Sequence, residues 1–293
     1  MELRHIRYFV RAAELMHFTR AAESLYVSQP TLSTHIQQLE EELGEPLFDR
    51  VGRNVQLTAA GQLFLKYGQS ALESLDVAKE KITALKDLVS GTVRVGALLT
   101  FGYEILPKWI GSFHASHPQL RIDIQTGPSD QIESEILSGG IDLGLAFVPP
   151  VSDDIHGEVL LVDRVYLVVS EAHALARRKQ ISVGEVADLP LAMVTRRWAA
   201  RRIYDSFLAD NQVAPNILVE SDDLHVLLKL ATTGDVAVMM PRVAVGKNPA
   251  LRLIPIEDSP KVEYGILWHA HGYLSPAAQA FLSHIRSEAI IPN

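Results

Sequence analysis

The sequence predicts an α/β protein in which an N-terminal unit rich in α-helix leads, through one long helix, into a larger part made of two α/β lobes. Three observations carry this prediction. Residues 1–58 show apolar side chains at helical spacing and no alternation of strands with helices. Residues 59–89 contain no proline. From residue 91 onward, strand-like and helix-like segments alternate, which is typical of a largely parallel sheet covered by helices.

The N-terminal unit contains signals for three helices and a hairpin. The first two helices are separated by a break, after which Thr19 is the expected N-cap of the second helix. The third helix has Ser28 as its expected N-cap and Pro30 in its first turn, where a missing amide proton has no intrahelical partner, and Gly44 ends it. Residues 47–57 then place two short strands around a glycine-containing turn, as in a hairpin.

Residues 59–90 are predicted to form one long helix that links the N-terminal unit to the rest, with Thr58 as its N-cap. Apolar residues on heptad-related positions are typical of a helix that pairs with a second copy, and here they are Leu65, Leu72, Leu75, Ile82 and Val89. Lys79 and Lys86 interrupt this seam. An amphipathic helix packed on its own chain is therefore the alternative.

The remaining residues are expected to form two lobes. The first lobe comprises residues 91–162 together with 265–293, and the second comprises residues 163–264, because the last predicted strand and helix return the chain to the first lobe. In open α/β sheets, ligands bind outside the carboxyl ends of the strands. We therefore expect a ligand in the crevice between the lobes.

Composition narrows the classes of function. The 293 residues include no cysteine, which excludes disulfides, thiolate metal sites, iron–sulfur clusters and a cysteine nucleophile. Acidic residues outnumber basic ones 35 to 27, for a net charge of −8, so binding to nucleic acid requires a locally positive surface. The chain shows no secretory signal, and its apolar stretches are far shorter than the roughly 20 residues of a membrane span. We therefore expect a cytoplasmic protein with no membrane partner.

The third predicted helix has an apolar face and a face of small or amide side chains. Its apolar residues are spaced four, three and four apart and form one stripe: Leu32, Ile36, Leu39 and Leu43. At about 100° per residue, the residues directed away from this stripe are Gln29, Pro30, Ser33, Thr34 and Gln37. Glutamine can pair with adenine, and hydroxyl groups donate or accept, so this face suits base edges in the major groove. A helical interaction module is the alternative.

All formal positive charge among residues 1–58 comes from arginine, at Arg4, Arg7, Arg11, Arg20, Arg50 and Arg53. Arg50 and Arg53 lie on the predicted hairpin. From there, phosphate or the minor groove of a bound duplex is within reach.

Several motifs together resemble the signature of LysR-type transcriptional regulators. In the N-terminal unit they are FTRAAESL at 18–25, VSQPTLS at 27–33, LFDR at 47–50 and LTAAG at 57–61. In the larger part, GTVRVG at 91–96, GIDLG at 140–144 and GDVA at 234–237 resemble the effector domain of that family. The resemblance covers the whole chain, and by overall similarity it is nearest to regulators of cyanate-operon type.

This resemblance implies a winged helix-turn-helix, a linker-helix dimer commonly assembled into a homotetramer, and a two-lobed effector domain like periplasmic binding proteins. It also implies binding of double-stranded promoter DNA, modulated by a small-molecule co-inducer and read out by RNA polymerase, with no other cofactor. Carried onto this chain, it implies base contacts from Gln29, Pro30, Ser33 and Thr34, backbone contacts from Thr31 and Arg50, and a wing contact from Arg53. Thr34 matches a specificity position.

The same resemblance places the effector between the lobes. The matching positions are Leu99, Thr100, Phe101, Thr126, Gly127, Phe147, Thr195, Arg196 and Arg197. Thr100 and Thr195 each precede an expected helix, so hydroxyl and free amides can converge on a small anion, although each threonine can equally serve only as a cap. Phe147 and Met239 are candidate apolar walls, with burial in the core as the alternative.

Metal and catalytic sites are not expected. The pairs His114/His117 and His269/His271 lack a third ligand. The acidic residues at 222–223 beside His225 come without a nucleophile elbow, and no Walker or dinucleotide-binding glycine pattern occurs. A ligand-responsive DNA regulator therefore ranks first, a cytosolic small-molecule-binding module without DNA function second, and an enzyme third.

Overall fold

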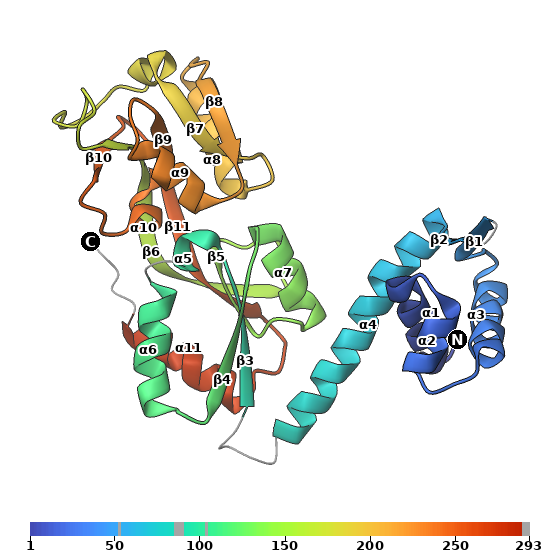
Figure 1. The fold of residues 1–293 in the computed structure, drawn as a ribbon. Coiled ribbons are helices and arrows are strands. Elements are labelled where there is room, and N and C mark those ends of the chain that lie inside the picture. Colours follow the sequence, from blue (N-terminus) through green and yellow to red (C-terminus); the bar gives the residue numbers. More distant parts are fainter. Residues whose placement is uncertain (52–53, 85–90, 103–104, 289–293) are drawn as a thin grey trace. The chain divides into compact units, whose positions relative to one another are not determined.

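A computed structural model of the chain describes residues 1–51, 54–84, 91–102 and 105–288. The chain divides into two compact units, Met1–Thr83 and Ala84–Asn293 (Figure 1). Within the described ranges, no helix is both long enough and apolar enough to cross a membrane.

The N-terminal unit consists of three helices, a hairpin and a long helix, as predicted. Its elements are α1 (Leu3–Leu15), α2 (Phe18–Ser24), α3 (Gln29–Leu43), β1 (Phe48–Val51), β2 (Asn54–Leu57) and α4 (Ala59–Ala84). Its core is built around Phe9, whose ring lies 5.3 Å from that of Phe48 and 5.2 Å from that of Phe64. These contacts tie α1, the hairpin and α4 together, because each ring comes from a different element.

The ends of the helices follow local hydrogen-bonding rules. Ser28 accepts the N–H of Thr31 at the start of α3, and Thr58 accepts the N–H of Gly61 at the start of α4, so both predicted caps are confirmed. Gly44 ends α3 with φ +75°. The prediction for Thr19 is wrong: α2 begins at Phe18 because the imidazole of His17 accepts the N–H of Arg20, which makes His17 the cap.

The long helix α4 has two kinds of apolar residue. Leu65 and Leu72 pack against the core of the N-terminal unit, whereas the side chains of Leu75 and Ile82 are exposed. The predicted helix extends to residue 90, but residues 85–90, and with them Lys86 and Val89, lie outside the described part. The heptad pattern therefore combines positions that belong to the unit's own core with positions that face away from it.

The first lobe of the larger unit is a parallel sheet with helices on both sides (Figure 1). It contains β3 (Gly91–Ala97), α5 (Leu99–Gly102), α6 (Leu106–Ser116), β4 (Leu120–Thr126), α7 (Ser129–Ser138), β5 (Leu143–Phe147) and α11 (Pro276–Glu288). Helix α7 packs on β5 and α11 packs on β3. The sequence predicts strands at 92–97, 120–125 and 143–147 and helices at 106–114, 132–137 and 276–285, and each is confirmed within a few residues.

The second lobe repeats this design with β7 (Pro190–Val194), α8 (Ala199–Asp210), β8 (Asn216–Ser221), α9 (Leu224–Ala231), β9 (Ala237–Pro241), the short α10 (Arg242–Val245) and β10 (Leu251–Pro255). A 3-10 helix, η1, spans Gly184–Asp188. Strand β7 is parallel to both β8 and β9. The sequence predicts alternating strands and helices at 165–169, 191–194, 201–208, 217–220, 224–230 and 236–240 and a returning strand at 264–269, but it predicts no element at β10.

Two antiparallel strands, β6 (Ile155–Ser170) and β11 (Lys261–His269), join the lobes. The strand order is β4-β3-β5-β11-β6-β9-β7-β8, with β10 also paired to β6. The first part of β6 pairs with β11, and its second part pairs with β9 and β10. The chain thus crosses from lobe to lobe near the predicted boundary residues, although only the second half of β6 was predicted.

A fully buried arginine anchors α8. Arg201 is 1% exposed, and its guanidinium donates to the carboxylate of Asp205 at 2.7 Å, to the backbone carbonyl of Val194 at 2.9 Å and to the carboxylate of Glu220. Its partners come from α8 itself and from the ends of β7 and β8. Arg201 therefore sets the position of α8 against the carboxyl ends of these parallel strands.

Replacing Arg201 with methionine is expected to lower the free energy of unfolding of the larger unit by about 2 kcal/mol, because the carbonyl and both carboxylates lose their donor while the carboxylates keep contact with water. All three tryptophans, Trp109, Trp198 and Trp268, lie in this unit, so tryptophan fluorescence during urea unfolding measures it. Arg202→Met, on the exposed side of the same helix, is the matched control. Equal stability of the two variants would contradict the anchoring role.

Candidate functional site

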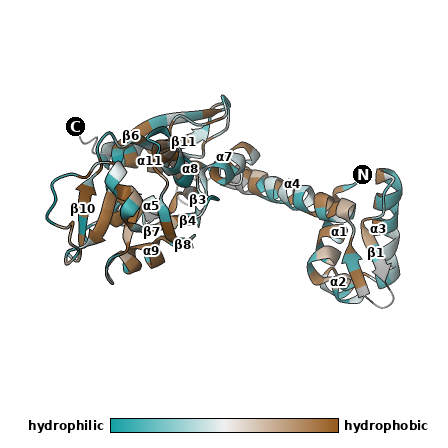
Figure 2. Ribbon diagram, turned by 90° about the horizontal axis from the view of Figure 1, so that it is seen from above, coloured by the Kyte–Doolittle hydropathy of each residue, from teal (hydrophilic) through white to brown (hydrophobic). Residues whose placement is uncertain are grey.

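Helix α3 buries one face and exposes another, as its sequence predicts. Leu32, Ile36 and Leu39 are at most 2% exposed. Leu43 was expected in the same stripe but is 39% exposed, because the helix ends beside it at Gly44. Figure 2 shows α3 as largely hydrophilic, with few hydrophobic residues along it. The outward face of α3 is thus set by three buried residues.

The residues predicted to contact DNA lie on this outward face. The exposed ones are Gln29, Pro30, Thr31, Thr34 and Gln37, while Ser33 is half-buried. The amide of Gln29 donates to the hydroxyl of Ser33 at 2.9 Å, and the hydroxyl of Thr34 donates to the carbonyl of Pro30 at 3.0 Å. These bonds hold the side chains close to the helix, so α3 presents a smooth polar surface.

Of the charged side chains near α3, one acidic residue is bonded within the unit and one basic residue is exposed. Glu40 points inward and accepts the N–H groups of Leu47 and Phe48, which fastens the hairpin to α3. Arg20, exposed on α2, has no acidic partner among the described residues. Arg20 was counted as a charge in the sequence but not selected as a contact residue.

The two arginines predicted on the hairpin are less fully described. Arg50 lies on β1, where its backbone is paired with that of Val55, but its side chain is outside the description. Arg53 lies outside the described residues altogether.

The second candidate site, which we call the interlobe cavity, lies where the two lobes of the larger unit meet. The first lobe contributes Leu98, Leu99, Thr100 and Phe147. The second lobe contributes Val194, Trp198, Ala199, Ala200, Tyr204, Asp222, Leu224, Met240, Pro241 and Ala244. The residues come from the carboxyl ends of strands and from the starts of α5, α8 and α9, which is where open α/β sheets bind ligands.

Two polar groups stand out in this mainly apolar lining. The hydroxyl oxygen of Thr100 is buried and has no hydrogen-bond partner among the residues that the structure describes. The carboxylate of Asp222 accepts hydrogen bonds from the indole N–H of Trp198, at 3.1 Å, and from the hydroxyl of Thr195. Burial raises the pKa of Tyr204 above its ordinary value, so this phenol stays neutral. The cavity therefore offers a free hydroxyl and an oriented carboxylate between apolar walls.

The cavity is nearly closed in this conformation. Its volume is about 40 Å³, whereas ligand sites typically measure roughly 300–1,000 Å³. A ligand can enter only if the lobes move apart or the lining side chains rotate.

Several residues predicted for the effector lie elsewhere. Phe101 is fully buried, with its ring 5.7 Å from that of Tyr264, so its side chain serves the core. Thr126 is exposed and Gly127 is buried, but neither lines the cavity. Met239, a proposed wall, belongs to the hydrophobic core, and its neighbour Met240 lines the cavity instead.

The arginines expected to bind an anionic effector also lie away from the cavity lining. The side chain of Arg196 is 82% exposed and lies 3.8 Å from the carboxylate of Asp205. Arg197 is 62% exposed and 4.0 Å from the outer oxygen of Asp222. Among the described residues of the lining, the only charged side chain is the carboxylate of Asp222. The described lining therefore supplies no cation for the expected anion.

The sequence interpretation selected three of the lining residues, Leu99, Thr100 and Phe147, and missed the others, among them Trp198, Asp222 and Met240. A signal for Asp222 was available. Asp222 follows directly on β8, whose carboxyl end meets that of β7 at one edge because the two strands are parallel. No group of three histidine, aspartate or glutamate side chains suited to a metal ion occurs in the described ranges.

Comparison with known proteins shows which families the two parts of the chain resemble. Residues 3–62 match the lysR family of bacterial regulatory helix-turn-helix proteins, and residues 86–290 match the LysR substrate binding domain. The transcriptional dual regulator GltC of Bacillus subtilis (strain 168) is 31% identical over 97% of this chain and 96% of its own length.

A second relative and a solved structure extend the likeness over the full length. The SDS degradation transcriptional activation protein of Pseudomonas sp. (strain ATCC 19151) is 31% identical over 98% of this chain and 96% of its own length. The crystal structure of full-length CbnR in complex with its target DNA has the same fold, with a TM-score of 0.75 and 24% identity over 99% of this chain and all of that one. The chain therefore belongs to the LysR family, whose members are DNA-binding transcriptional regulators with an effector-binding domain and not enzymes.

Proposed function

We propose that α3 lies in the major groove of promoter DNA and reads its sequence. Its outward face carries amide and hydroxyl groups, which can pair with base edges, and small residues that allow close approach. Base contacts are assigned to Gln29, Pro30, Ser33, Thr34 and Gln37, and phosphate or wing contacts to Thr31, Arg50 and Arg53. Arg20 joins the phosphate contacts because it is an exposed cation without an acidic partner in the described part.

Replacing Thr34 with alanine is expected to change operator preference without unfolding the protein. The Thr34 hydroxyl is exposed and bonded only within its own helix, so the fold loses little, whereas one base contact is worth about 1 kcal/mol, or about fivefold in preference. The measurement is selection of bound sequences from a random duplex library by purified protein at a stated salt concentration.

Two controls accompany this selection. Gln69→Ala, an exposed polar residue on α4, is expected to select the wild-type site. Arg50→Ala is expected to weaken binding to all sequences alike, because a phosphate contact carries no sequence information. If Thr34→Ala selects the same site as the wild type, Thr34 does not contribute to specificity.

We further propose that the protein acts in the cytoplasm as a homo-oligomer, a tetramer built from dimers. The tetramer bound to promoter DNA would contact RNA polymerase. The support for pairing lies on α4, where Leu63, Tyr67, Leu75 and Ile82 are exposed. At about 100° per residue these four side chains fall on one face of the helix. Such a face suits packing against the same helix of a second copy.

The effector is proposed to bind in the interlobe cavity, between lobe 91–162 with 265–293 and lobe 163–264. The observation that carries this proposal is the buried hydroxyl of Thr100 with no partner, in the same lining as the oriented carboxylate of Asp222. A neutral, mainly apolar molecule with an acceptor for Thr100 and a donor for Asp222 fits this lining. Its binding would favour one separation of the lobes, and only a difference in affinity between the two separations can change DNA binding.

Replacing Thr100 with valine is expected to raise the free energy of unfolding of the ligand-free protein by about 1 kcal/mol, because it removes a buried hydroxyl that lacks a partner. Thr232→Val, whose hydroxyl donates to the carbonyl of Lys229 at 2.7 Å, is the control and is expected to give no gain. Both are measured by urea unfolding. A loss of stability in Thr100→Val would mean that its hydroxyl is already used by the fold.

A further inference from the structure

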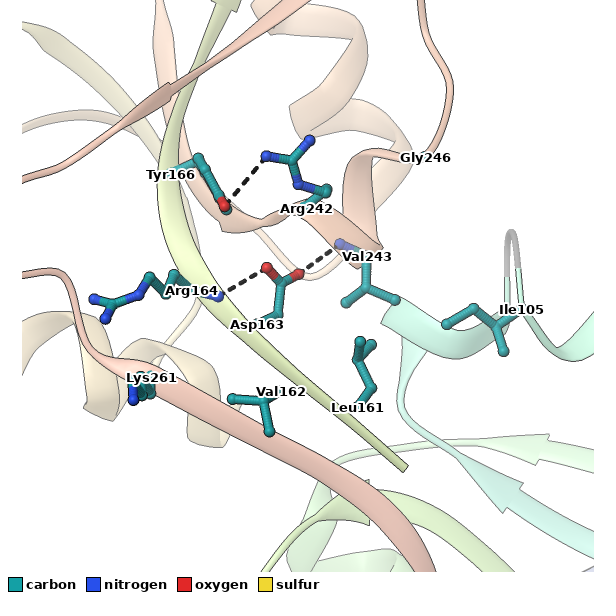
Figure 3. A pocket seen from close by; sticks show the side chains of 10 residues that line it. All are labelled: Ile105, Leu161, Val162, Asp163, Arg164, Tyr166, Arg242, Val243, Gly246 and Lys261. Atoms are coloured by element: carbon teal, nitrogen blue, oxygen red, sulfur yellow. Dashed lines mark hydrogen bonds between the residues drawn. The ribbon is translucent and has the colours of Figure 1, made fainter. Parts of the chain in front are cut away.

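Asp163 lies at the point where β6 passes from the first lobe to the second. Its backbone is opposite Val262 in the ladder with β11, and just beyond it β6 begins to pair with β9. One oxygen of its half-buried carboxylate accepts the N–H of Arg164 at 2.7 Å, and the other accepts the N–H of Val243 in α10 at 2.8 Å (Figure 3). The side chain therefore ties the strand that joins the lobes to a helix of the second lobe.

Helix α10 is too short to hold its shape alone. It spans only Arg242–Val245, whereas isolated helices are marginal in water even at about 12 residues. Its own N-cap residue, Pro241, makes no side-chain cap hydrogen bond. A carboxylate at the start of a helix is favoured by the free N–H groups and by the helix dipole. Asp163, which comes from another element, therefore takes the part of a cap residue.

A second contact between α10 and β6 runs through Arg242. Its guanidinium donates to the phenol oxygen of Tyr166 at 3.2 Å and lies 4.8 Å from the centre of that ring. Arg242 is exposed, so this contact is weakened by water more than the bonds of the half-buried Asp163 are. Burial raises the pKa of the Asp163 carboxyl above its ordinary value, while the N–H of Val243 and the charge of Arg242 oppose this rise. The start of α10 therefore stabilises the carboxylate, and the carboxylate stabilises α10.

Helix α10 forms part of the wall of the interlobe cavity. Ala244 lines the cavity, and α10 packs against α5, the helix of the first lobe that carries Thr100. The charge of Asp163 adds to the effect of burial in raising the pKa of Tyr204, which also lines the cavity, so the carboxylate lies close behind the wall. The contact between α5 and α10 is thus a place where the two lobes meet beside the proposed effector.

We propose that Asp163 is a positioning residue that holds α10 against α5 and so keeps the interlobe cavity in its nearly closed form. When the lobes separate, the bond from Asp163 keeps α10 with the second lobe. Without that bond α10 can move by itself, and the separation of Thr100 from Ala244 is no longer fixed. The proposal rests on the proposed effector site, because it concerns how that site closes.

The test is hydrogen exchange, followed by mass spectrometry, on the full-length protein without added ligand. In Asp163→Asn the single carbonyl oxygen cannot accept both N–H groups. We expect exchange in residues 242–246 to become about tenfold faster, because a hydrogen bond to a charged group is lost. We also expect exchange in residues 98–102 to become about threefold faster, although α5 belongs to the other lobe, because it loses its packing partner.

Two further variants complete the test. Glu185→Gln is the matched control, because the Glu185 carboxylate also accepts a backbone N–H in the second lobe, that of Ser182 at 3.0 Å. It is expected to leave both segments at the wild-type rate. Asp163→Ser, whose side chain is shorter and carries no amide group, is expected to behave as Asp163→Asn does.

Three results would overturn the proposal. In the first, residues 242–246 keep the wild-type rate in both Asp163 variants. In the second, residues 242–246 exchange faster but residues 98–102 do not, which would make the role of Asp163 local to α10. In the third, strand β5 at 143–147 accelerates by the same factor as the two segments, which would make Asp163 a support of the whole fold.

The outcome does not depend on whether an effector binds. Failure of the exchange test would remove the positioning role of Asp163 and leave the proposed effector site unaffected. Failure of the Thr100→Val stability test would instead count against the effector site.

Discussion

The antiparallel pairing of β6 with β11 is the constraint on which the larger unit depends. The ladder runs from Arg164 opposite Lys261 to Ile155 opposite His269, and β6 continues beyond it into the sheet of the second lobe. Hydrogen-bonded strands cannot slip by one residue without turning every side chain to the opposite face. A change in the angle between the lobes must therefore be taken up by bending these strands or by repacking the short elements beside them, which are α5 and α10.

Much of the fold could be predicted because its signals are local. The buried stripe of α3, the caps Ser28 and Thr58, and the parallel strands of both lobes follow from spacing and from single side chains. The errors arise where a competing group decides the outcome. At the start of α2 the cap is His17 and not Thr19, because the His17 ring accepts the N–H of Arg20. The first half of β6 was missed because its residues do not alternate between buried and exposed, and it is a strand through its pairing with β11.

The effector site was harder to predict because neighbouring residues on one element face different surroundings. Thr100 and Phe101 are adjacent on α5, yet the hydroxyl lines the interlobe cavity and the ring packs on Tyr264 in the core. Successive side chains are turned by about 100° along a helix and by about 180° along a strand. A prediction that is wrong by one position therefore assigns a core residue to the cavity lining. The same shift separates Met239 from Met240. Only tertiary packing decides which of the two neighbours faces the ligand.

Helix α10 is a short element that borders the interlobe cavity and is tied to the strand joining the lobes. It has four residues, and its second N–H is held by Asp163 of β6. Because the interlobe cavity is nearly closed here, a rigid opening of the lobes would move α5, α10 or both, whereas rotation of lining side chains would leave them in place. An effector that binds better to one position of α10 than to the other shifts the population toward that position. A ligand that binds both positions of α10 equally well would change nothing, however tightly it binds.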